Sequence, residues 1–460
     1  MEKKRLIERK RYMQILRSWK EKNVIKVLTG VRRCGKSTLL QMFSDELLQT
    51  GVAKEQIQFY NFEDLETLAL GDIFQIHTHI KNKLVADKMN YIFLDEIQNV
   101  KDFQRLVDSL FIKENCDVYI TGSNAHLLSG ELATLLTGRY IETEVLPFSY
   151  DEYLSFLDAH SEKLRKIEES KYREDYLFTN DLNSENNDTY PQKVPKNESF
   201  SISQDNSLRF NRFESLKNFV YYGGMPEVYN LLINDPMQSD IFVKSVLNTI
   251  IEKDIFTRND IRNKAVFQKI IDFVLDSVGK YVSANSISNA FKNEKIAIRN
   301  ETVMNYLSYL NDAMLLYSVP RYDIKGKGLL QSLNKFYLSD MSFRRIRLGK
   351  SEDEDVGRLL ENAVYLELRR RYEKVYVGKF RDMEVDFVVR DHDGYTSYYQ
   401  VAWTTMHSDE TLQRELAPLN AIKDSNPKYL LTTDRDFDPV YNGIRKLNVV
   451  NWLLDPPKNV

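Results

Sequence analysis

The chain has 460 residues and a formal net charge of −3, and at roughly 100–200 residues per domain its length predicts three or four domains with ample cores. The nearly balanced charge gives no whole-chain bias toward nucleic acid, so a nucleic-acid surface would have to be local. Two cysteines argue against a disulfide framework or a zinc site and favour a reduced, cytoplasmic compartment, and no run of about 18 apolar residues predicts a membrane span.

The first predicted strand leads directly into a phosphate-binding loop. Residues 1–12, which precede it, are dense in Lys, Arg and Glu without an apolar run, so they do not predict a secretory signal. The apolar run Val24–Leu28 predicts a buried parallel strand, and a helical pattern follows residue 38. Between them, residues 30–38 read Gly-Val-Arg-Arg-Cys-Gly-Lys-Ser-Thr, which matches the P-loop pattern. A turn that merely joins a strand to a helix is the weaker interpretation.

The P-loop pattern gives each fixed position a role. Gly30 and Gly35 permit backbone angles that turn successive N–H groups toward an anion, and the helix N-terminus adds partial positive charge. Lys36 is predicted to contact the β- and γ-phosphates of ATP, and Ser37 to hold Mg²⁺. The predicted cofactor-binding residues are Gly30, Val31, Arg32, Arg33, Cys34, Gly35, Lys36, Ser37 and Thr38.

A second apolar strand ends in two carboxylates. Tyr91–Leu94 is followed by Asp95 and Glu96. A buried strand would deliver Asp95 to the Mg²⁺ beside Ser37, the Walker B role, and place Glu96 to act as general base on the attacking water. An acidic pair at a strand end is common by chance, and the P-loop upstream is what favours the catalytic interpretation.

Two further strands are predicted at 57–64, with a polar end, and at 117–124, which ends in Gly-Ser-Asn. Ser123 or Asn124 is predicted to contact the γ-phosphate or its water as a sensor. From these residues alone, an ordinary polar turn explains the sequence equally well.

Arg139 precedes a fifth predicted strand, which runs through Val145. Three interpretations of Arg139 stay open at this point. It is an arginine finger that acts across a subunit interface, a sensor in its own chain, or an ordinary surface arginine.

In this order, the motifs resemble the AAA+-type ATPases of bacteria and archaea that carry a C-terminal domain of unknown function. The resemblance covers nearly the whole chain except residues 158–212. It implies a five-stranded parallel ATPase core, hydrolysis by Glu96, and sensor and finger roles for Ser123 or Asn124 and for Arg139. The motifs that carry it are Gly30–Thr38, Phe93–Gln98, Ile120–Asn124, Leu136–Tyr140, Tyr222–Glu227 and Val385–Phe387.

The middle of the chain changes composition. Between Asn180 and Ser207 there are six Asn, five Ser and two Pro, so residues 158–212 predict a flexible insertion. Helical patterns on either side predict a lid region at 151–280. Within it, Lys253, Asp254 and Arg258 are interpreted either as a signal of nucleotide state between domains or, more simply, as a solvated helix face.

Residues 281–345 follow the order helix, turn, helix and ribbon, which resembles a winged helix. Its predicted recognition helix is 299–311, and Lys325 and Lys327 lie on the wing. Between residues 280 and 350 there are 12 Lys or Arg against 5 Asp or Glu, so double-stranded DNA is a predicted partner. Packing against another protein, or against a second copy of the chain, is the alternative.

Residues 346–460 predict an αβββαβ order that resembles the restriction-endonuclease-like fold. In active members, the third strand presents Glu-x-Lys, whose carboxylate binds Mg²⁺ and whose lysine helps to activate water. Here the matching residues are Gln400, Val401 and Ala402, which provide no carboxylate and no cation. The sequence therefore predicts an inactive fold used for binding. It leaves open whether a metal binds the three nearby carboxylates, Glu361, Glu384 and Asp386.

The predicted fold class is α/β, with a P-loop NTPase sheet of AAA+-like type at 1–150, the helical lid region, the winged helix and the endonuclease-like domain. The predicted function is a Mg²⁺-dependent ATPase whose nucleotide state controls a C-terminal DNA- or protein-binding module. Two alternatives are an ATP-switched DNA-binding regulator with negligible turnover and an ATP-dependent nuclease. The predicted catalytic residues are Glu96, Lys36, Arg139 and Asn124, and the metal is assigned to Ser37 and Asp95.

Overall fold

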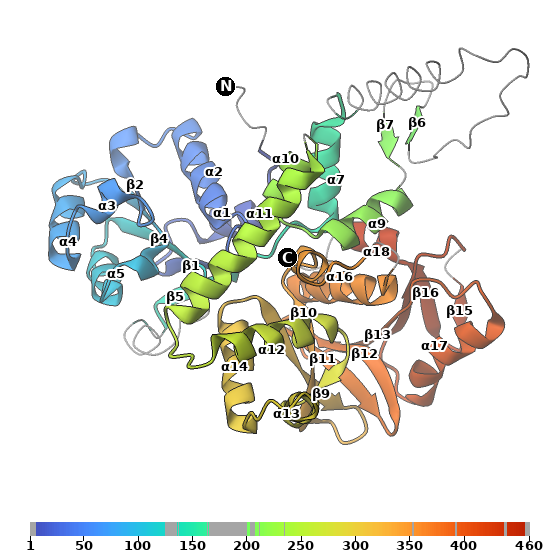
Figure 1. The fold of residues 1–460 in the computed structure, drawn as a ribbon. Coiled ribbons are helices and arrows are strands. Elements are labelled where there is room, and N and C mark those ends of the chain that lie inside the picture. The colour runs from blue at the N-terminus through green and yellow to red at the C-terminus, as the bar shows by residue number, and fades with distance from the viewer. Residues whose placement is uncertain are drawn as a thin grey trace, which may run out of the picture.

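The computed structural model describes residues 6–124, 136, 138–162, 164, 200–202, 208–210, 212–233, 235–351, 354–391, 393–436 and 439–455. The predicted insertion at 158–212 lies largely outside the described residues, so its flexibility stays a prediction. Figure 1 shows an N-terminal sheet and a C-terminal sheet, each covered by helices, with further helices between them.

The N-terminal sheet has five parallel strands in the order β2-β3-β4-β1-β5. This confirms the five-stranded parallel core that the sequence predicts. The three inner strands β1, β3 and β4 are buried along almost their whole length, as expected when helices cover both faces of a sheet, whereas the edge strands β2 and β5 are partly exposed. The strands are β1 (Ile25–Thr29), β2 (Ile57–Asn61), β3 (Asn90–Asp95), β4 (Cys116–Gly122) and β5 (Tyr140–Glu144).

Alternate residues of each strand face different helices, as the two-residue period of a strand requires. Leu28 and Phe93 pack with α1 (Lys10–Trp19) and α2 (Lys36–Gln49) on one face. Residues next to them in sequence pack with α4 and α5 on the other face. The helices and turns between the strands are η1 (Lys54–Gln56), α3 (Leu65–Leu68), α4 (Ile73–Asn82), η2 (Ile97–Asn99) and α5 (Phe103–Phe111).

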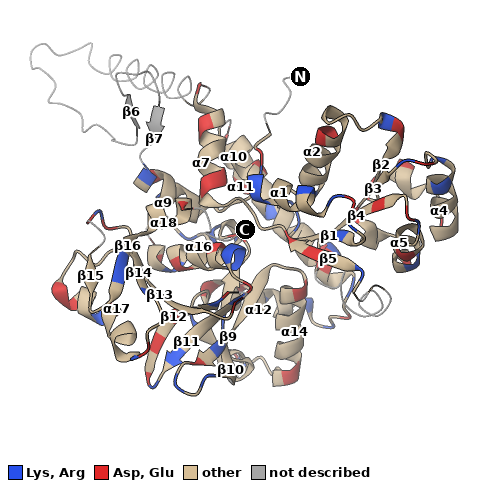
Figure 2. Cartoon of the chain, turned by 180° about the vertical axis from the view of Figure 1, so that it is seen from behind, with Lys and Arg blue, Asp and Glu red and all other residues tan. Residues whose placement is uncertain are grey.

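A helical region follows the N-terminal sheet, in agreement with the helical patterns of the sequence. In both views of the chain, α11 lies between the N-terminal sheet and the C-terminal region (Figures 1 and 2). A π-helix continues α11 and leads toward α12. The elements are α7 (Tyr150–Ala159), the paired strands β6 (Phe200–Ile202) and β7 (Leu208–Phe210), α9 (Arg212–Tyr222), α10 (Pro226–Leu232), α11 (Pro236–Thr249), η4 (Ile250–Phe256) and α12 (Lys264–Asp276).

The C-terminal part contains one nine-stranded sheet in the order β15-β16-β14-β13-β12-β11-β9-β10-β8. Its helices are α13 (Ala284–Asn293), α14 (Asn300–Asp312), α15 (Ser342–Leu348), α16 (Val356–Arg371), α17 (Asp409–Ala421) and α18 (Val449–Leu454). Its strands are β8 (Tyr281–Val282), β9 (Leu316–Asp323), β10 (Gly328–Leu338), β11 (Lys374–Phe380), β12 (Met383–Arg390), β13 (Thr396–Val401), β14 (Lys428–Thr432), β15 (Val440–Tyr441) and β16 (Ile444–Asn448).

This sheet crosses the boundary that the sequence analysis places at residue 345. Strand β9 pairs in parallel with β11, with Arg321 opposite Val377 and Tyr322 opposite Gly378. The helix-turn-helix and hairpin at 281–345 and the αβββαβ order after residue 355 are both present. They share backbone hydrogen bonds, however, and so differ from the two separate domains that were expected.

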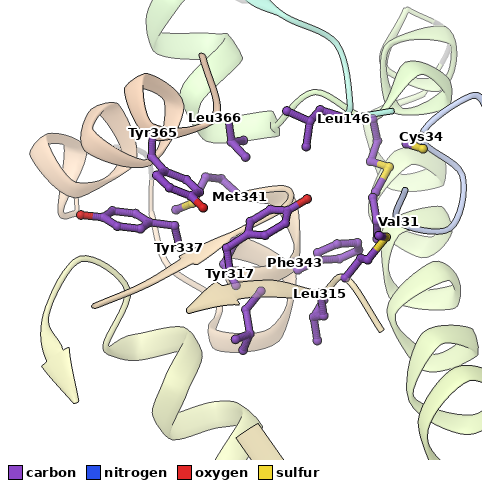
Figure 3. Close-up of a cluster of buried hydrophobic side chains, with 14 of the residues drawn as sticks. Val31, Cys34, Leu146, Leu315, Tyr317, Tyr337, Met341, Phe343, Tyr365 and Leu366 are labelled. Atoms are coloured by element: carbon purple, nitrogen blue, oxygen red, sulfur yellow. The ribbon is translucent and has the colours of Figure 1, made fainter. Parts of the chain in front are cut away.

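The phosphate-binding loop packs against the C-terminal part. Val31 and Cys34 belong to the same buried hydrophobic cluster as Leu315, Tyr317 and Phe343 (Figure 3). The N-terminal core therefore continues into the C-terminal core through the loop itself. None of the helices in the described ranges is both long and apolar enough to cross a membrane.

Candidate nucleotide site

The phosphate-binding loop connects β1 to α2 with backbone angles that two glycines supply. Gly30 has φ 149° and Gly35 has φ 107°, which side chains other than hydrogen disfavour. A Cβ added at Gly30 would lie 2.2 Å from the carbonyl oxygen of Val145, so this position has no room for one. Helix α2 begins directly after Gly35, and its N-terminus favours bound anions.

Lys36, the first residue of α2, is buried with its ammonium turned back into the loop. Its Nζ donates to the carbonyl oxygen of Gly30 at 3.0 Å and lies 3.6 Å from Oε1 of Glu96. The ammonium thus lies between the loop and the predicted general base, where it can neutralise charge on a transferring phosphoryl group. Ser37 and Thr38, the next two residues, are exposed.

Thr121, on the neighbouring strand β4, connects the carboxylate of Asp95 to the backbone of Glu96. Its hydroxyl donates to Oδ1 of Asp95 at 2.6 Å and accepts from the backbone N–H of Glu96 at 2.9 Å. The sequence analysis did not single out Thr121. Its place in Ile-Thr-Gly-Ser-Asn, at the end of a strand next to the Walker B strand, is the signal that could have found it.

The two carboxylates differ in their affinity for a proton. Burial raises the pKa of Asp95 above its usual value. Burial also acts to raise the pKa of Glu96, but the Lys36 ammonium and the Gln98 amide outweigh it and hold that pKa below its usual value. Glu96 is therefore ionised at neutral pH and able to accept a proton from water. A cation bound at Asp95 would favour its ionised form as well.

Ser123 and Asn124 follow β4 and therefore lie beside the end of β3, with which β4 pairs. Nε2 of Gln98 lies 3.5 Å from Oγ of Ser123, and a hydrogen bond from Ser123 helps to keep Glu96 ionised. Asn124 is buried. This placement fits a sensor of the γ-phosphate, and that role stays a prediction.

Arg139 lies at the amino-terminal ends of the parallel strands, whereas the phosphate-binding loop lies at their carboxyl-terminal ends. The carbonyl oxygen of Arg139 accepts from the N–H of Ile25, at the start of β1, whereas the loop follows the end of β1. At about 3.3 Å per residue, the length of β1 separates the two. Its guanidinium pairs with Asp108 at 2.5 Å and lies over the ring of Phe111. This position does not favour a sensor role for Arg139 in its own chain, and both that role and action across a subunit interface stay predictions.

A cavity of about 160 Å³ adjoins the loop at Gly35 and Thr38. Apolar side chains from distant segments line it, together with a few polar groups, and this mixture suits a nucleobase. The sequence analysis missed this cavity because no local motif unites its walls. Lining residues outside the loop include Leu6, Ile7, Met42, Phe148, Glu227 and Asn230.

Arg9 fastens the segment before α1 to the phosphate-binding loop. It is buried, donates to the carbonyl oxygen of Cys34 at 3.0 Å, and pairs with Glu152 at 2.8 Å. Burial raises the pKa of Glu152, but the Arg9 guanidinium more than offsets this and holds that pKa below its usual value. The N-terminal wall of the cavity is therefore fixed by a charged hydrogen-bond network.

The profile of the AAA domain family matches residues 22–154, and the profile of a domain of unknown function matches residues 213–354. An uncharacterized protein of Haemophilus influenzae is 34% identical over 452 residues, which cover 98% of this chain and 99% of that protein. The chain belongs to the family of that protein. In this family member, residues 22–154 form an AAA+-type P-loop domain, the class of domain that binds and hydrolyses ATP.

More distant similarities are found as well. An uncharacterized protein of Methanocaldococcus jannaschii is 29% identical over 373 residues, which cover 80% of this chain and 72% of that protein. Among solved structures, a Walker-type ATPase of Pyrococcus abyssi matches with a TM-score of 0.44 and 14% identity, covering 75% of this chain and 96% of that chain. The family assignment rests on the full-length relative and the AAA profile, not on this structural likeness.

Outside the AAA domain, the three carboxylates Glu361, Glu384 and Asp386 come together around Lys335 of β10. Nζ of Lys335 lies 3.0 Å from Oε1 of Glu361, 3.8 Å from Oδ1 of Asp386, and in contact with Glu384. Burial opposes the charge of Lys335, but the carboxylates hold its pKa above the usual value. Among the described residues, no group of three or more His, Cys, Asp or Glu is arranged to hold a metal ion.

The third-strand positions provide neither a carboxylate nor a cation, as the sequence indicates. Instead, Oε1 of Gln400 accepts from the N–H of Asp386 at 3.3 Å, and the N–H of Val401 donates to Oδ2 of Asp386 at 2.9 Å. Lys335 supplies a cation from a strand outside the expected αβββαβ order. No motif spacing would have located it.

At least half of the local positive charge that favoured DNA binding is buried or ion-paired within the AAA-domain protein itself. The predicted recognition helix, 299–311, corresponds to α14 (Asn300–Asp312), and its only basic residue is Arg299, which caps the N-terminus of α14. Lys325 and Lys327 are exposed on the hairpin between β9 and β10. Among the 12 basic residues counted between 280 and 350, those that are buried or ion-paired include Arg321, Lys335, Arg344, Arg345, Arg347 and Lys350.

Proposed function

We propose that this AAA-domain protein is a Mg²⁺-dependent, cytoplasmic ATPase whose nucleotide state controls its C-terminal part. The observation that carries the proposal is the convergence of Lys36, Glu96 and Asp95 beside a glycine loop at a helix N-terminus. The cavity next to Gly35 and Thr38 supplies a place for the base.

The oxygen-rich end of β3 suits Mg²⁺, which prefers carboxylate and hydroxyl oxygen ligands. Asp95 and Ser37 would hold the ion, and when bound it neutralises charge on the β- and γ-phosphates. The hydrogen bond from Thr121 orients Oδ1 of Asp95, and a hydrogen bond from Ser37 to the same carboxylate brings the two proposed metal ligands together.

Hydrolysis then proceeds by in-line attack of water on the γ-phosphorus. Glu96 accepts a proton from this water, and Lys36 stabilises charge on the phosphoryl oxygens. The bond from the γ-phosphorus to the bridging oxygen breaks, and ADP leaves with inorganic phosphate as the second product. We propose Arg139 of a second copy as the finger. Within one chain, Arg139 lies at the ends of the strands opposite to the phosphate-binding loop.

We favour a protein, including a second copy of this chain, over DNA as the partner of the C-terminal part. Helix α14 has no basic residue, and Met304 on it is 62% exposed, whereas phosphate contacts require Lys or Arg. DNA contact through Lys325 and Lys327 is the competing proposal. We do not favour nuclease activity, because the ammonium of Lys335 lies among the carboxylates that would hold its metal.

ATP turnover measured across protein concentrations, with and without duplex DNA, tests these proposals together. We expect Mg²⁺-dependent phosphate release that rises with protein concentration and does not respond to DNA. The absence of both nucleotide binding and turnover would contradict the ATPase proposal. Stimulation of ATP turnover by DNA that falls steeply with salt would favour DNA contact through Lys325 and Lys327 over a protein partner. Plasmid nicking that requires Mg²⁺ and disappears in Asp386→Ala would establish the nuclease alternative.

A further inference from the structure

Arg32 is a phosphate-loop residue whose side chain leaves the loop for the helical region. Its Nε and Nη2 donate to the two carboxylate oxygens of Asp254, both at 3.0 Å. Its Nη1 donates to Oε1 of Glu63 at 2.6 Å. One guanidinium thus joins the loop after β1, the segment after β2, and the π-helix that continues α11. A planar guanidinium can make this two-pronged contact, which a lysine ammonium cannot.

Asp254 depends on Arg32 because it has no access to solvent. Its side chain is 1% exposed, and its other cation, Arg258, lies 3.8 Å away. A buried carboxylate that loses its partner is strongly destabilised, so the π-helix is stable in this position only while Arg32 holds Asp254. π-Helical segments inside α-helices occur frequently at functional sites.

The Arg32–Asp254 pair spans a cleft of about 900 Å³. The AAA domain provides one wall, which includes Arg33 and Gln98, and α11 with the π-helix provides the other. The ion pair crosses this cleft, so it is a polar contact, beside the buried hydrophobic cluster that the loop shares with α11, through which a change at the loop can reach α11. Gln98 also donates to Glu96, so the same cleft borders the predicted catalytic base.

Arg32 also lies close enough to Glu96 to interact with its charge. A γ-phosphate bound beside Lys36 and Glu96 therefore brings additional negative charge into the reach of the same guanidinium. Arg32 would then have the phosphate as a further anionic partner besides Asp254 and Glu63, and one guanidinium cannot satisfy all three equally well.

We propose that Arg32 is the positioning residue through which the γ-phosphate acts on α11 and the C-terminal part, by competing with Asp254 for its guanidinium. This inference rests on the proposed ATPase function. The coupling is reciprocal. If ATP weakens the contact between Arg32 and Asp254, that contact must weaken ATP binding by the same factor. ADP lacks the γ-phosphate and is not subject to the competition.

Asp254→Asn tests the proposal, with Glu252→Gln as the matched control. Glu252 is an exposed carboxylate two residues away in the same π-helix. We expect Asp254→Asn to bind a non-hydrolysable ATP analogue about fivefold more tightly or better, with unchanged affinity for ADP. Glu252→Gln should change neither. A merely structural role for Asp254 would shift both nucleotides together or neither.

Hydrogen–deuterium exchange of residues 245–258 provides the second readout. In the wild type, the ATP analogue should increase exchange of this segment relative to ADP, and in Asp254→Asn the difference should be lost. Arg32→Lys, which keeps the charge but not the paired hydrogen bonds, should also reduce the difference and serves if Asp254→Asn does not fold. A wild type that binds no nucleotide would contradict the ATPase proposal. A wild type that binds the analogue without this exchange difference, or an Asp254→Asn variant that keeps it, would overturn the role of Arg32.

Discussion

Two lysines of this protein, Lys36 and Lys335, are buried to the same extent but differ in how many carboxylates lie close to the ammonium. Each is 3% exposed. Lys36 contacts loop carbonyl oxygens and has one carboxylate, that of Glu96, at 3.6 Å. Lys335 has three carboxylates within 3.8 Å. A cation with little anionic charge around it can bind an anionic ligand, whereas one that is surrounded by carboxylates is already neutralised.

The carboxylates next to these lysines differ in the same sense. The Lys36 ammonium holds the pKa of Glu96 below its usual value in spite of burial. Asp386 has a pKa well above its usual value, first because it is buried and second because Glu361 is close by, and Lys335 only partly opposes this. In the AAA domain, Lys36 lies next to one carboxylate, that of Glu96. In the C-terminal part, Lys335 lies next to three. The first arrangement is suited to chemistry and the second to holding strands and a helix together.

Glu96→Gln is the change with the largest expected effect. Loss of a general base lowers turnover by about 10²–10⁴-fold. ATP binding should persist, because the amide keeps the size of the side chain and leaves Lys36 in place. Phosphate release at saturating ATP measures the first effect, and titration with a fluorescent ATP analogue measures the second. Glu55→Gln, at an exposed position, is the control, and unchanged turnover in Glu96→Gln would remove Glu96 from the mechanism.

Lys335→Met tests the other side of the comparison. Removing the cation from a cluster in which Glu361 and Asp386 are largely buried and Glu384 is partly exposed is expected to lower the free energy of unfolding by about 3–5 kcal/mol. Urea denaturation measures the change, and Lys325→Met, on the exposed hairpin, should lie within about 0.5 kcal/mol of the wild type. A loss below about 1 kcal/mol would mean that the cluster is solvated and not a buried ion network.

Lys36→Ala should weaken ATP binding more than it changes stability. A hydrogen bond to a charged group is worth about 1.5–3 kcal/mol, which corresponds to about 10–150-fold in affinity. The measurement is calorimetric titration with a non-hydrolysable ATP analogue, and Lys54→Ala is the exposed control. If the variant bound the analogue as the wild type does, the loop would not be the phosphate site.

Asp386→Asn has the smallest expected effect, and pH reveals it. Because the folded-state pKa of Asp386 is raised above the 3.8 of an ordinary aspartate, the native state keeps a proton that the unfolded state releases. The wild type therefore loses stability as the pH rises above 3.8 toward that folded-state pKa, and the asparagine variant lacks this loss.

Urea unfolding at a series of pH values from 4 to 7 measures the difference between Asp386→Asn and the wild type. We expect the stability of the variant relative to the wild type to increase with pH over this range. A constant difference would indicate that Asp386 is ionised throughout, and the contrast with Glu96 would then be lost.

The sequence predicted the parts of the AAA domain that depend on neighbouring residues. Gly30 and Gly35 are needed by the loop geometry, and Lys36 follows them directly. Asp95 and Glu96 end an apolar strand, and their place beside the loop follows from the parallel order of the sheet. These features could be predicted because spacing along the chain fixes them.

The remaining features depend on residues that are far apart in the sequence. Arg32 meets Asp254 across 222 positions. Lys335 reaches its carboxylates only because β9 pairs with β11, and a single sequence does not indicate that pairing. The position of Arg139 relative to the loop also depends on strand pairing. Arg139 precedes β5, whose start lies at the ends of the strands opposite to the loop. Local composition also overstated the basic surface, because it does not distinguish exposed from buried arginines.

The parallel pairing of β9 with β11 decides how this protein can be divided. A chain that ends at residue 345 would leave the backbone donors and acceptors of β9 without the partners that Val377 and Gly378 provide. An uncovered edge strand recruits strands from other molecules. The same truncation would remove Glu361, Glu384 and Asp386 and leave Lys335 without its counter-charges. A fragment of this kind would aggregate, and its binding behaviour would report that self-association instead of any property of the hairpin in the intact chain.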